Sequence, residues 1–207
     1  AAPVCAMLGR GSRSWAFATA VSWLTFLVAL SLFAKTFGGT IISYEMGGWA
    51  PPIGIEYRVD VLNAFVLMIV SGMAAIVLPY ARRSVAAEIP AERQSFFYTA
   101  FLLCLTGLLG VTITGDAFNI FVFLEISSLA SYTLISLGKN RKALHAAYQY
   151  LIMGTIGATF YLIGIGLLYM MTGTLNIADL AQKIAPISDS RVVLTAFAFI
   201  VVGISLK

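Results

Sequence analysis

The stretch from Thr114 to Ser136, TGDAFNIFVFLEISSLASYTLIS, is apolar enough to cross a bilayer, yet it carries a carboxylate, Glu125, about halfway along. A charged side chain at that depth costs roughly 2.5–3.5 kcal/mol on insertion scales, so such residues usually face the protein interior and mark ion pathways. Helical spacing places Ser128, Tyr132 and Ser136 on the same face as Glu125. The stretch therefore predicts a membrane helix with a buried acidic site.

The composition of the whole chain is that of a membrane protein. Of its 207 residues, 60% are hydrophobic and 11% are charged, and the mean hydropathy is +0.93. A soluble chain of this length could not bury so much apolar surface. The net charge of +4 comes from basic residues in short links between apolar runs, which argues against a nucleic-acid-binding patch. The two cysteines, Cys5 and Cys104, lie in apolar runs and are interpreted as structural.

The apolar runs predict an all-α, polytopic helical bundle with about five full transmembrane helices and two partial ones. Full spans are predicted at residues 14–37, 61–80, 95–113, 117–137 and 144–171. Residues 1–8 and 192–207 are too short to span a bilayer, so both are predicted to be parts of helices that continue beyond the given sequence. The natural polypeptide is accordingly expected to continue past Lys207.

Two connecting segments and one set of glycines have patterns of their own. Residues 38–60 alternate in places and are interrupted by glycines and prolines, which favours an outward-facing loop with a surface hairpin. Residues 172–191 are expected to form a polar connection. The long span at 144–171 contains small residues that let membrane helices approach closely, namely Gly154, Gly157, Gly164 and Gly166.

The basic residues predict the orientation of the bundle. Eight of them lie in the links after residues 1–8, 61–80 and 117–137: Arg10, Arg13, Arg82, Arg83, Arg93, Lys139, Arg141 and Lys142. The alternate links contain four: Lys35, Arg58, Lys183 and Arg191. Because cytoplasmic loops carry the excess of Lys and Arg, we expect the loop at 38–60 and the turn at Asp116 to face outward.

The ionisable residues each allow two interpretations. Asp116 either caps the helix that it precedes or belongs to an ion path, and Glu125 either carries protons or makes a structural hydrogen bond. His145 has no second ligand-type residue nearby, which disfavours a metal site. An interfacial position is favoured for it, with a proton-relay role left open. Lys207 ends an apolar run, so it lies inside the membrane if the helix continues and snorkels to the surface if it does not.

Two stretches, GDAFNIFVFLEISSLASYTLISLGK and KALHAAYQYLIMGTIGATFYLIGIGLLYMMTGTLNIADL, resemble the core of the proton-translocating antiporter-type membrane subunits. The likeness is strongest to the D-type subunit of the Mrp multisubunit cation/proton antiporters. This subunit is related to antiporter-like subunits of respiratory complex I and of membrane-bound hydrogenases. The resemblance implies that this chain is the first part of a fourteen-helix, inverted-repeat fold, in which the Glu125 helix is the fifth.

The resemblance also implies roles for individual residues. Glu125 matches a glutamate that pairs with a lysine on the seventh helix, where Lys207 has the matching position, and the pair is expected to translocate protons as it opens and closes. Asp116 matches an acidic turn before the fifth helix, and Asp60 matches an aspartate that opens the third. Possible supporting residues for the proton path are Asp116, Asp60, His145, Ser128 and Tyr132.

The function expected from these observations is that of a proton-conducting subunit of a multisubunit monovalent cation (Na⁺)/proton antiporter in the bacterial inner membrane. The expected partners are other subunits of that complex, the lipid bilayer, protons and monovalent cations, but not nucleic acid. No cofactor, metal site or catalytic residue is expected, and the chain is interpreted as a transporter subunit rather than an enzyme. One alternative is a proton-pumping subunit of NADH:quinone oxidoreductase or of a membrane-bound hydrogenase. A second is a non-conducting membrane scaffold.

Overall fold

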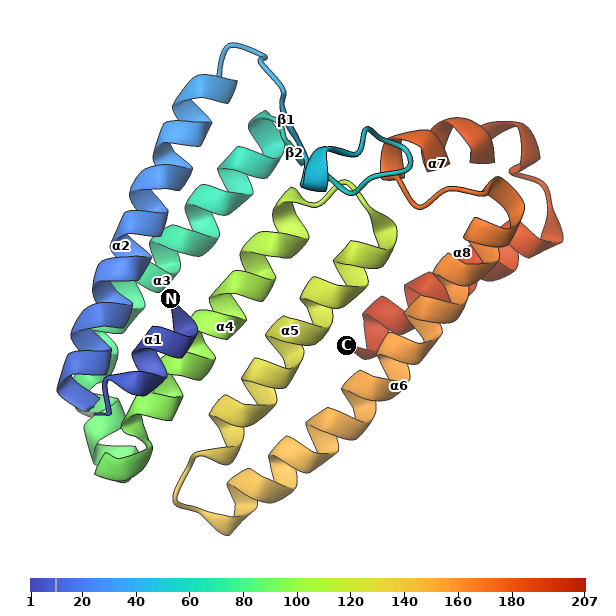
Figure 1. The fold of residues 1–207 in the computed structure, drawn as a ribbon. Helices are drawn as coiled ribbons and strands as arrows, with labels where there is room; N and C mark the ends of the chain where they lie inside the picture. The colour runs from blue at the N-terminus through green and yellow to red at the C-terminus, as the bar shows by residue number, and fades with distance from the viewer. Residues whose placement is uncertain (10) are drawn as a thin grey trace.

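The computed structural model describes residues 1–9 and 11–207, and long helices dominate it (Figure 1). The helices are α1 (Ala2–Met7), α2 (Gly11–Thr36), α3 (Val61–Glu88), α4 (Gln94–Ile113), α5 (Ala117–Ser136), α6 (Arg141–Thr172), α7 (Ile177–Ile184) and α8 (Arg191–Leu206). Two short strands, β1 (Ile42–Glu45) and β2 (Glu56–Val59), lie between α2 and α3. Short 3₁₀ turns occur at Met46–Gly48, Ala91–Arg93 and Ala185–Ile187.

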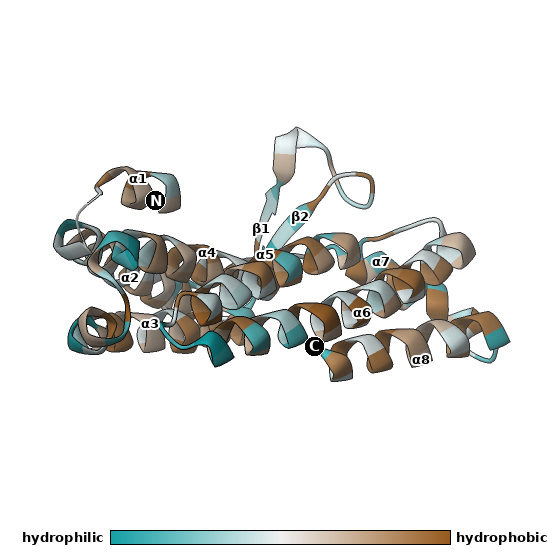
Figure 2. Cartoon of the chain, turned by 90° about the horizontal axis from the view of Figure 1, so that it is seen from below, coloured by the Kyte–Doolittle hydropathy of each residue, from teal (hydrophilic) through white to brown (hydrophobic). Residues whose placement is uncertain are grey.

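Within the described part of the chain, five helices are long and apolar enough to cross a membrane, and they are α2 to α6. These helices run side by side in alternating directions, so that their ends gather at two opposite edges of the bundle (Figure 1). Seen from below, the bundle is a flattened array from which α1 and the hairpin project on the same side (Figure 2). The all-α membrane fold expected from the sequence is confirmed. Arg10, one of the eight basic residues used for the orientation, lies outside the described residues.

Helix α3 is longer than the span predicted at residues 61–80. It continues through Pro79 to Glu88, and the backbone N–H of Ile89 closes its last turn on the carbonyl of Val85 (2.9 Å). The charged residues after Tyr80 resemble a link in composition, but Ala, Arg and Glu are strong helix formers. Val85 and Ile89 are buried in a cluster with residues of α1, α2 and α4, which stabilises the extension.

The loop at residues 38–60 contains an antiparallel hairpin in which Ile42 pairs with Val59 and Glu45 pairs with Glu56. Its second strand is tied to the turn between α4 and α5, because the N–H of Gly115 donates to the carbonyl of Glu56 (2.8 Å). The segment after α6 joins the same turn, since the N–H of Ala117 donates to the carbonyl of Leu175 (2.8 Å). Three segments far apart in the sequence therefore fix the start of α5.

The sequence predicted only a polar connection at residues 172–191. The structure shows that this connection also contains a helix, α7. The side chain of Asn176 caps α7 by accepting from the N–H groups of Ala178 and Asp179 (both 3.1 Å). An ion pair between Asp179 and Lys183 (2.9 Å) lies along its exposed side, while Leu180 is buried. The apolar residues Ile177, Leu180 and Ile184 do follow helical spacing, but the helix is only eight residues long and the segment was interpreted from its polar residues and Pro186.

The predicted orientation can be tested with two conservative cysteine substitutions at opposite ends of the bundle. Ser84 is exposed near the end of α3, and Ser188 is exposed after α7. By the distribution of Lys and Arg, Ser188→Cys should react with a membrane-impermeant maleimide added outside intact cells, and Ser84→Cys should react only after the membrane is opened. The opposite pattern of labelling would invert the topology.

Candidate functional site

The Glu125 and Lys207 side chains meet as an ion pair between α5 and the end of α8. The ammonium Nζ of Lys207 donates to Oε1 of Glu125, although 82 residues separate the two in sequence. The side chains are only 26% exposed for Glu125 and 12% for Lys207. Glu125 lies about 12 Å along α5 from its first residue, at the standard helical rise. The pair therefore places two opposite charges near the middle of a membrane-spanning helix.

Close packing of α5 on α4 fixes the position of Glu125. A Cβ atom added to Gly107 of α4 would lie 2.6 Å from the backbone nitrogen of Ser127 and 2.8 Å from the carbonyl of Phe123, so the two helices touch at this glycine. One turn further on, the ring of Phe123 fills the space beside Gly110. Small residues allow this approach in membranes, where van der Waals packing drives helix association.

A second glycine contact, between α6 and α8, positions Lys207. A Cβ on Gly203 would lie 2.6 Å from the backbone nitrogen of Tyr161, and one on Gly157 would lie 2.8 Å from the carbonyl of Gly203. Gly164 touches the same helix near Ala196. The prediction of close packing thus holds for Gly157 and Gly164, but not for Gly166, which has no neighbour within 4 Å.

Tyr161 connects the start of α5 with the backbone of α8. Its buried hydroxyl donates to the carbonyl of Ala117 (3.3 Å). Its ring lines a small cavity together with Gly203 and Lys207. Tyr161 was not among the residues predicted from the sequence, and the available signal was its position on the helical face that it shares with Gly157 and Gly164.

Tyr132 and Ser128, which were predicted to share the face of Glu125, continue the polar surface along α5. Tyr132 is buried with its hydroxyl directed at α6, and Ser128 lines a cavity together with Lys207. That hydroxyl lies against Gly154 of α6, where a Cβ atom would collide with it. The ring of Tyr132 also packs edge-on against Tyr150, with centroids 4.9 Å apart. Gly154 therefore makes room for a polar side chain rather than for a helix backbone.

Asp60 and His145 lie apart from the ion pair. Asp60 caps α3 by accepting from the N–H of Asn63 (2.9 Å), and it lines a polar pocket with Glu56 and Arg58. His145 is exposed in the first turns of α6. At the standard helical rise, His145 lies about 18 Å along α6 from Gly157, the residue of α6 that packs against Lys207. In the described part of the chain, no three His, Cys, Asp or Glu residues are placed to hold a metal ion.

Asp116 is buried at the N-cap of α5, where its carboxylate accepts from the N–H of Asn119 (2.7 Å). It is nine residues before Glu125, so the structure does not bring the two carboxylates together. Burial raises the pKa of the Asp116 carboxyl from its ordinary value of 3.8, against the opposing effect of hydrogen bonds from the backbone at Asn119 and Phe118. The folded protein therefore holds this proton more tightly than the unfolded chain does.

The raised pKa of Asp116 predicts a pH dependence of stability. The contribution of the protonated Asp116 carboxyl to the free energy of unfolding is complete below pH 3.8. It is lost as the pH rises through the higher pKa that this carboxyl has in the folded state. Asp116→Asn retains a good N-cap but cannot titrate. We expect thermal unfolding in detergent micelles to show that raising the pH from 3.8 weakens the wild-type protein more than the variant. Parallel curves for the two proteins would contradict this assignment.

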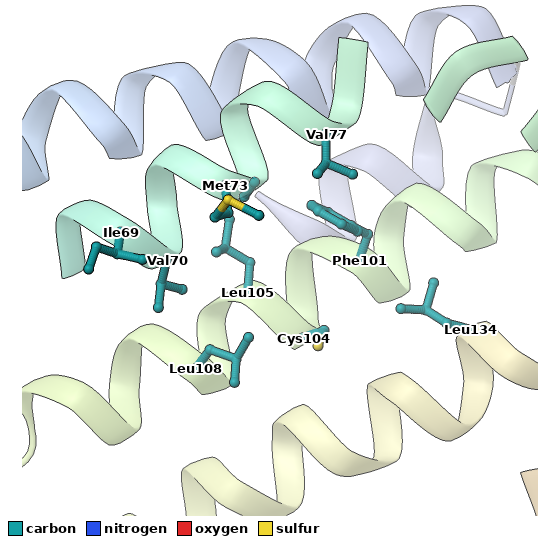
Figure 3. A pocket seen from close by; sticks show the side chains of 10 residues that line it. Ile69, Val70, Met73, Val77, Phe101, Cys104, Leu105, Leu108 and Leu134 are labelled. Carbon is teal, nitrogen blue, oxygen red and sulfur yellow. The ribbon is translucent and has the colours of Figure 1, made fainter. Parts of the chain in front are cut away.

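A pocket of about 360 Å³ between α3, α4 and α5 has different chemistry (Figure 3). Its labelled side chains are aliphatic or aromatic apart from the thioether of Met73 and the thiol of Cys104. Without a carboxylate, ammonium or hydroxyl group it offers nothing that could relay a proton. The ion pair, rather than this pocket, is the candidate functional site.

The sequence and fold were compared with those of known proteins. A family described as "NADH:quinone oxidoreductase/Mrp antiporter, TM" matches residues 114–207. NADH-quinone oxidoreductase subunit N of Desulforudis audaxviator is 49% identical over 164 residues, which are 79% of this chain and 32% of that protein. The D-type subunit of the Na(+)/H(+) antiporter of Bacillus subtilis is 34% identical over 169 residues, 82% of this chain and 34% of that protein. The chain thus spans about a third of the length of these curated relatives.

Two solved structures contain chains with the same fold. One is the Mrp complex from Dietzia sp. DQ12-45-1b, with a TM-score of 0.87 and 26% identity over 99% of this chain and 38% of that chain. The other is the membrane-bound sulfane sulfur reductase, an archaeal respiratory membrane complex, with a TM-score of 0.89 and 32% identity over 99% of this chain and 41% of that chain. The chain is therefore a homologue of the antiporter-like membrane subunits of NADH:quinone oxidoreductases and Mrp antiporters, and its residues 114–207 belong to the transmembrane family that those complexes share.

Proposed function

We propose that this chain is a proton-conducting part of a multisubunit monovalent cation/proton antiporter in a bacterial cell membrane. The observation that carries the proposal is the half-buried Glu125–Lys207 ion pair in the middle of the bundle. Ionisable residues at this depth are costly and usually serve ion transport. The partners are other subunits of the complex, and the transported ions are protons and a monovalent cation such as Na⁺. Similarity to the D-type antiporter subunits supports this choice.

The mechanism follows from the coupling between the two charges. While the pair is closed, each charge stabilises the other, so Glu125 remains a carboxylate and Lys207 an ammonium. When the pair opens, the two charges lose this mutual stabilisation, and the carboxylate of Glu125 and the ammonium of Lys207 become free to exchange hydrogen bonds with other donors and acceptors. Opening and closing can therefore take up and release a proton. Moving one charge through 100 mV is worth about 2.3 kcal/mol, so the cycle is driven by an ion gradient or by a linked reaction elsewhere in the complex.

A second candidate is a proton-pumping subunit of a respiratory complex. The specific observation in its favour is the 49% identity to NADH-quinone oxidoreductase subunit N. The same ion pair would serve either complex, because the proposed mechanism only requires that the opening of the pair be coupled to an energy source. A non-conducting scaffold is the third hypothesis, and it gives no reason for a charged pair at mid-membrane.

These candidates are separated by transport measurements on the intact complex. Proton exchange for Na⁺, K⁺ or Li⁺ in everted vesicles, without NADH or quinone, is expected for the antiporter. Proton movement that requires NADH oxidation and quinone reduction, with no cation exchange, would instead assign the chain to a respiratory complex. A complex that moves protons in neither assay would leave the scaffold hypothesis.

A further inference from the structure

The apolar pocket on α3, α4 and α5 has the shape of a groove, the tail groove, with a volume of about 360 Å³. Ile69 and Leu108 lie at one end of it, and Val77, Phe101 and Leu134 lie at the other (Figure 3). From Ile69 to Val77 it follows α3 for about 12 Å, at the standard helical rise. One leaflet of a bilayer contributes about 15 Å to a hydrocarbon core of roughly 30 Å. The length of the tail groove is therefore close to the depth of a single leaflet.

A polar space, the head pocket, continues the tail groove at the end of the bundle where α5 meets α6. It has a volume of about 590 Å³. Leu134 lines both spaces, and Phe97 of the head pocket lies one turn along α4 from Phe101 of the tail groove. The two spaces are thus stacked end to end along α4 and α5. The polar side chains that line the head pocket are those of Glu88, Lys139 and Asn140.

The head pocket lies at the surface of the membrane. Helix α5 has 20 residues, and at the standard rise these measure about 30 Å, the thickness of the hydrocarbon core. Leu134 comes just before its last residue, Ser136, and Lys139 and Asn140 follow in the link to α6. The polar lining therefore begins where the hydrocarbon ends. A phospholipid has the same division, with its acyl chains in the core and its headgroup at the surface.

The head pocket carries one charge of each sign and has donors to spare. The ammonium of Lys139 donates to the carbonyl of Ala87 (2.8 Å), so two of its three protons are left for another acceptor. The side-chain oxygen of Asn140 accepts from the N–H of Lys142 (3.0 Å), which leaves its NH₂ group free to donate. The carboxylate of Glu88 can only accept. The pocket thus offers donors to a phosphate and an acceptor to an ammonium group.

We propose that the tail groove and the head pocket together bind one phospholipid whose headgroup carries both a phosphate and a primary amine, as in phosphatidylethanolamine. One acyl chain fills the tail groove. Lys139 and Asn140 donate to the phosphate, and Glu88 accepts from the amine. The carboxylate disfavours a headgroup that is only anionic, because it would leave Glu88 without a cation beside it. This site lies apart from the Glu125–Lys207 pair and is independent of the proposed transport function.

A helix of another protein segment is the alternative occupant of the tail groove. An α-helix with its side chains is about 10–12 Å across, so a 12 Å length of it occupies on the order of 1,000 Å³. The tail groove has about a third of that volume. A helix could therefore only lie over the groove, whereas an extended hydrocarbon chain fits inside it. The paired charges of the head pocket favour the lipid as well, since they match a zwitterionic headgroup.

The test uses the full-length subunit, assembled in its complex and placed in phosphatidylcholine nanodiscs. The probe is a trace of phosphatidylethanolamine with a photoactivatable diazirine in one acyl chain, and mass spectrometry identifies the crosslinked peptides. We expect crosslinks on the segments of α3 and α4 that line the tail groove. Added unlabelled phosphatidylethanolamine should reduce them many-fold, and the same amount of phosphatidylglycerol should not. Equal competition by the two lipids, or crosslinks spread evenly over all lipid-facing helices, would overturn the proposal.

A matched pair of substitutions on α3 tests the tail groove. Val77→Phe adds a ring to a residue that lines the groove, whereas Ile76→Phe adds one to its neighbour, which does not. Both side chains are exposed, at 42% for Val77 and 67% for Ile76, so each can grow without entering the core. Crosslinking should fall several-fold in Val77→Phe and stay unchanged in Ile76→Phe. Equal crosslinking in the two variants would place the lipid outside the groove.

Glu88→Gln tests the recognition of the amine. This variant should still be crosslinked in the tail groove, but phosphatidylglycerol should now compete as well as phosphatidylethanolamine, because the charge that disfavours an anionic headgroup is gone. An unchanged preference for phosphatidylethanolamine would overturn the role of Glu88. Crosslinking reads lipid binding without reference to transport, so it can succeed even if Glu125→Gln shows that the pair carries no protons.

Discussion

Glu125→Gln is expected to abolish proton transport while the complex assembles normally. The amide has nearly the shape of the carboxylate and can still hydrogen bond to Lys207, but it cannot titrate or hold the ammonium by charge. A positioned proton-transfer group contributes typically about 10²–10⁴-fold to a rate, so a loss of that order is expected. The measurement is pH-dependent cation/proton exchange in everted vesicles, with the amount of assembled complex determined by blot.

Two further variants separate a proton carrier from a structural partner. Glu125→Asp keeps a carboxylate but withdraws it by one methylene from Lys207, so intermediate transport is expected. Lys207→Ala should remove much of the same function, and the double variant should transport little worse than either single one, because both changes break one interaction. Wild-type exchange by a well-assembled Glu125→Gln complex would exclude the proton-carrying role and favour the scaffold hypothesis.

The Glu125 helix could be predicted almost to the residue because local signals agree there. A mainly apolar run of one membrane thickness begins after Asp116, which caps the helix, and ends just before Gly138. The pairing of Glu125 with Lys207 could not be predicted from any such pattern, since the two residues are far apart in sequence. It followed only from the resemblance to a known family, and the structure brings the two side chains together.

The features that sequence reasoning missed depend on contacts between distant segments. The charged residues after Tyr80 have the composition of a link between helices. Only the burial of Val85 against neighbouring helices shows that α3 continues. Cys104 was interpreted as structural from the apolar run around it. The structure adds that its thiol lies 3.4 Å from the hydroxyl of Ser131 on α5, a contact between two helices. Neither property can be read from a window of neighbouring residues.

Gly203→Ala is expected to separate α8 from α6 and to break the ion pair without touching either charged residue. The added Cβ would lie 2.6 Å from the backbone nitrogen of Tyr161 and 2.7 Å from the carbonyl of Gly157, and backbone atoms cannot move aside as a flexible side chain would. Overpacking of this kind costs typically about 1–3 kcal/mol. We therefore expect a lower thermal unfolding temperature in detergent and a strong loss of transport, since Lys207 is only four residues further along the chain.

Gly166→Ala is the matched control for this prediction, because it makes the same chemical change on α6, the helix that α8 packs against. No atom lies within 4 Å of the Cβ that it would add. In a helix interior alanine is roughly 0.5–1 kcal/mol more favourable than glycine, so this variant should be as stable as the wild-type protein or slightly more so, with normal transport. The two substitutions thus differ in the sign of their effect. If Gly203→Ala transported normally, the close approach of α6 and α8 would not be what holds Lys207 against Glu125.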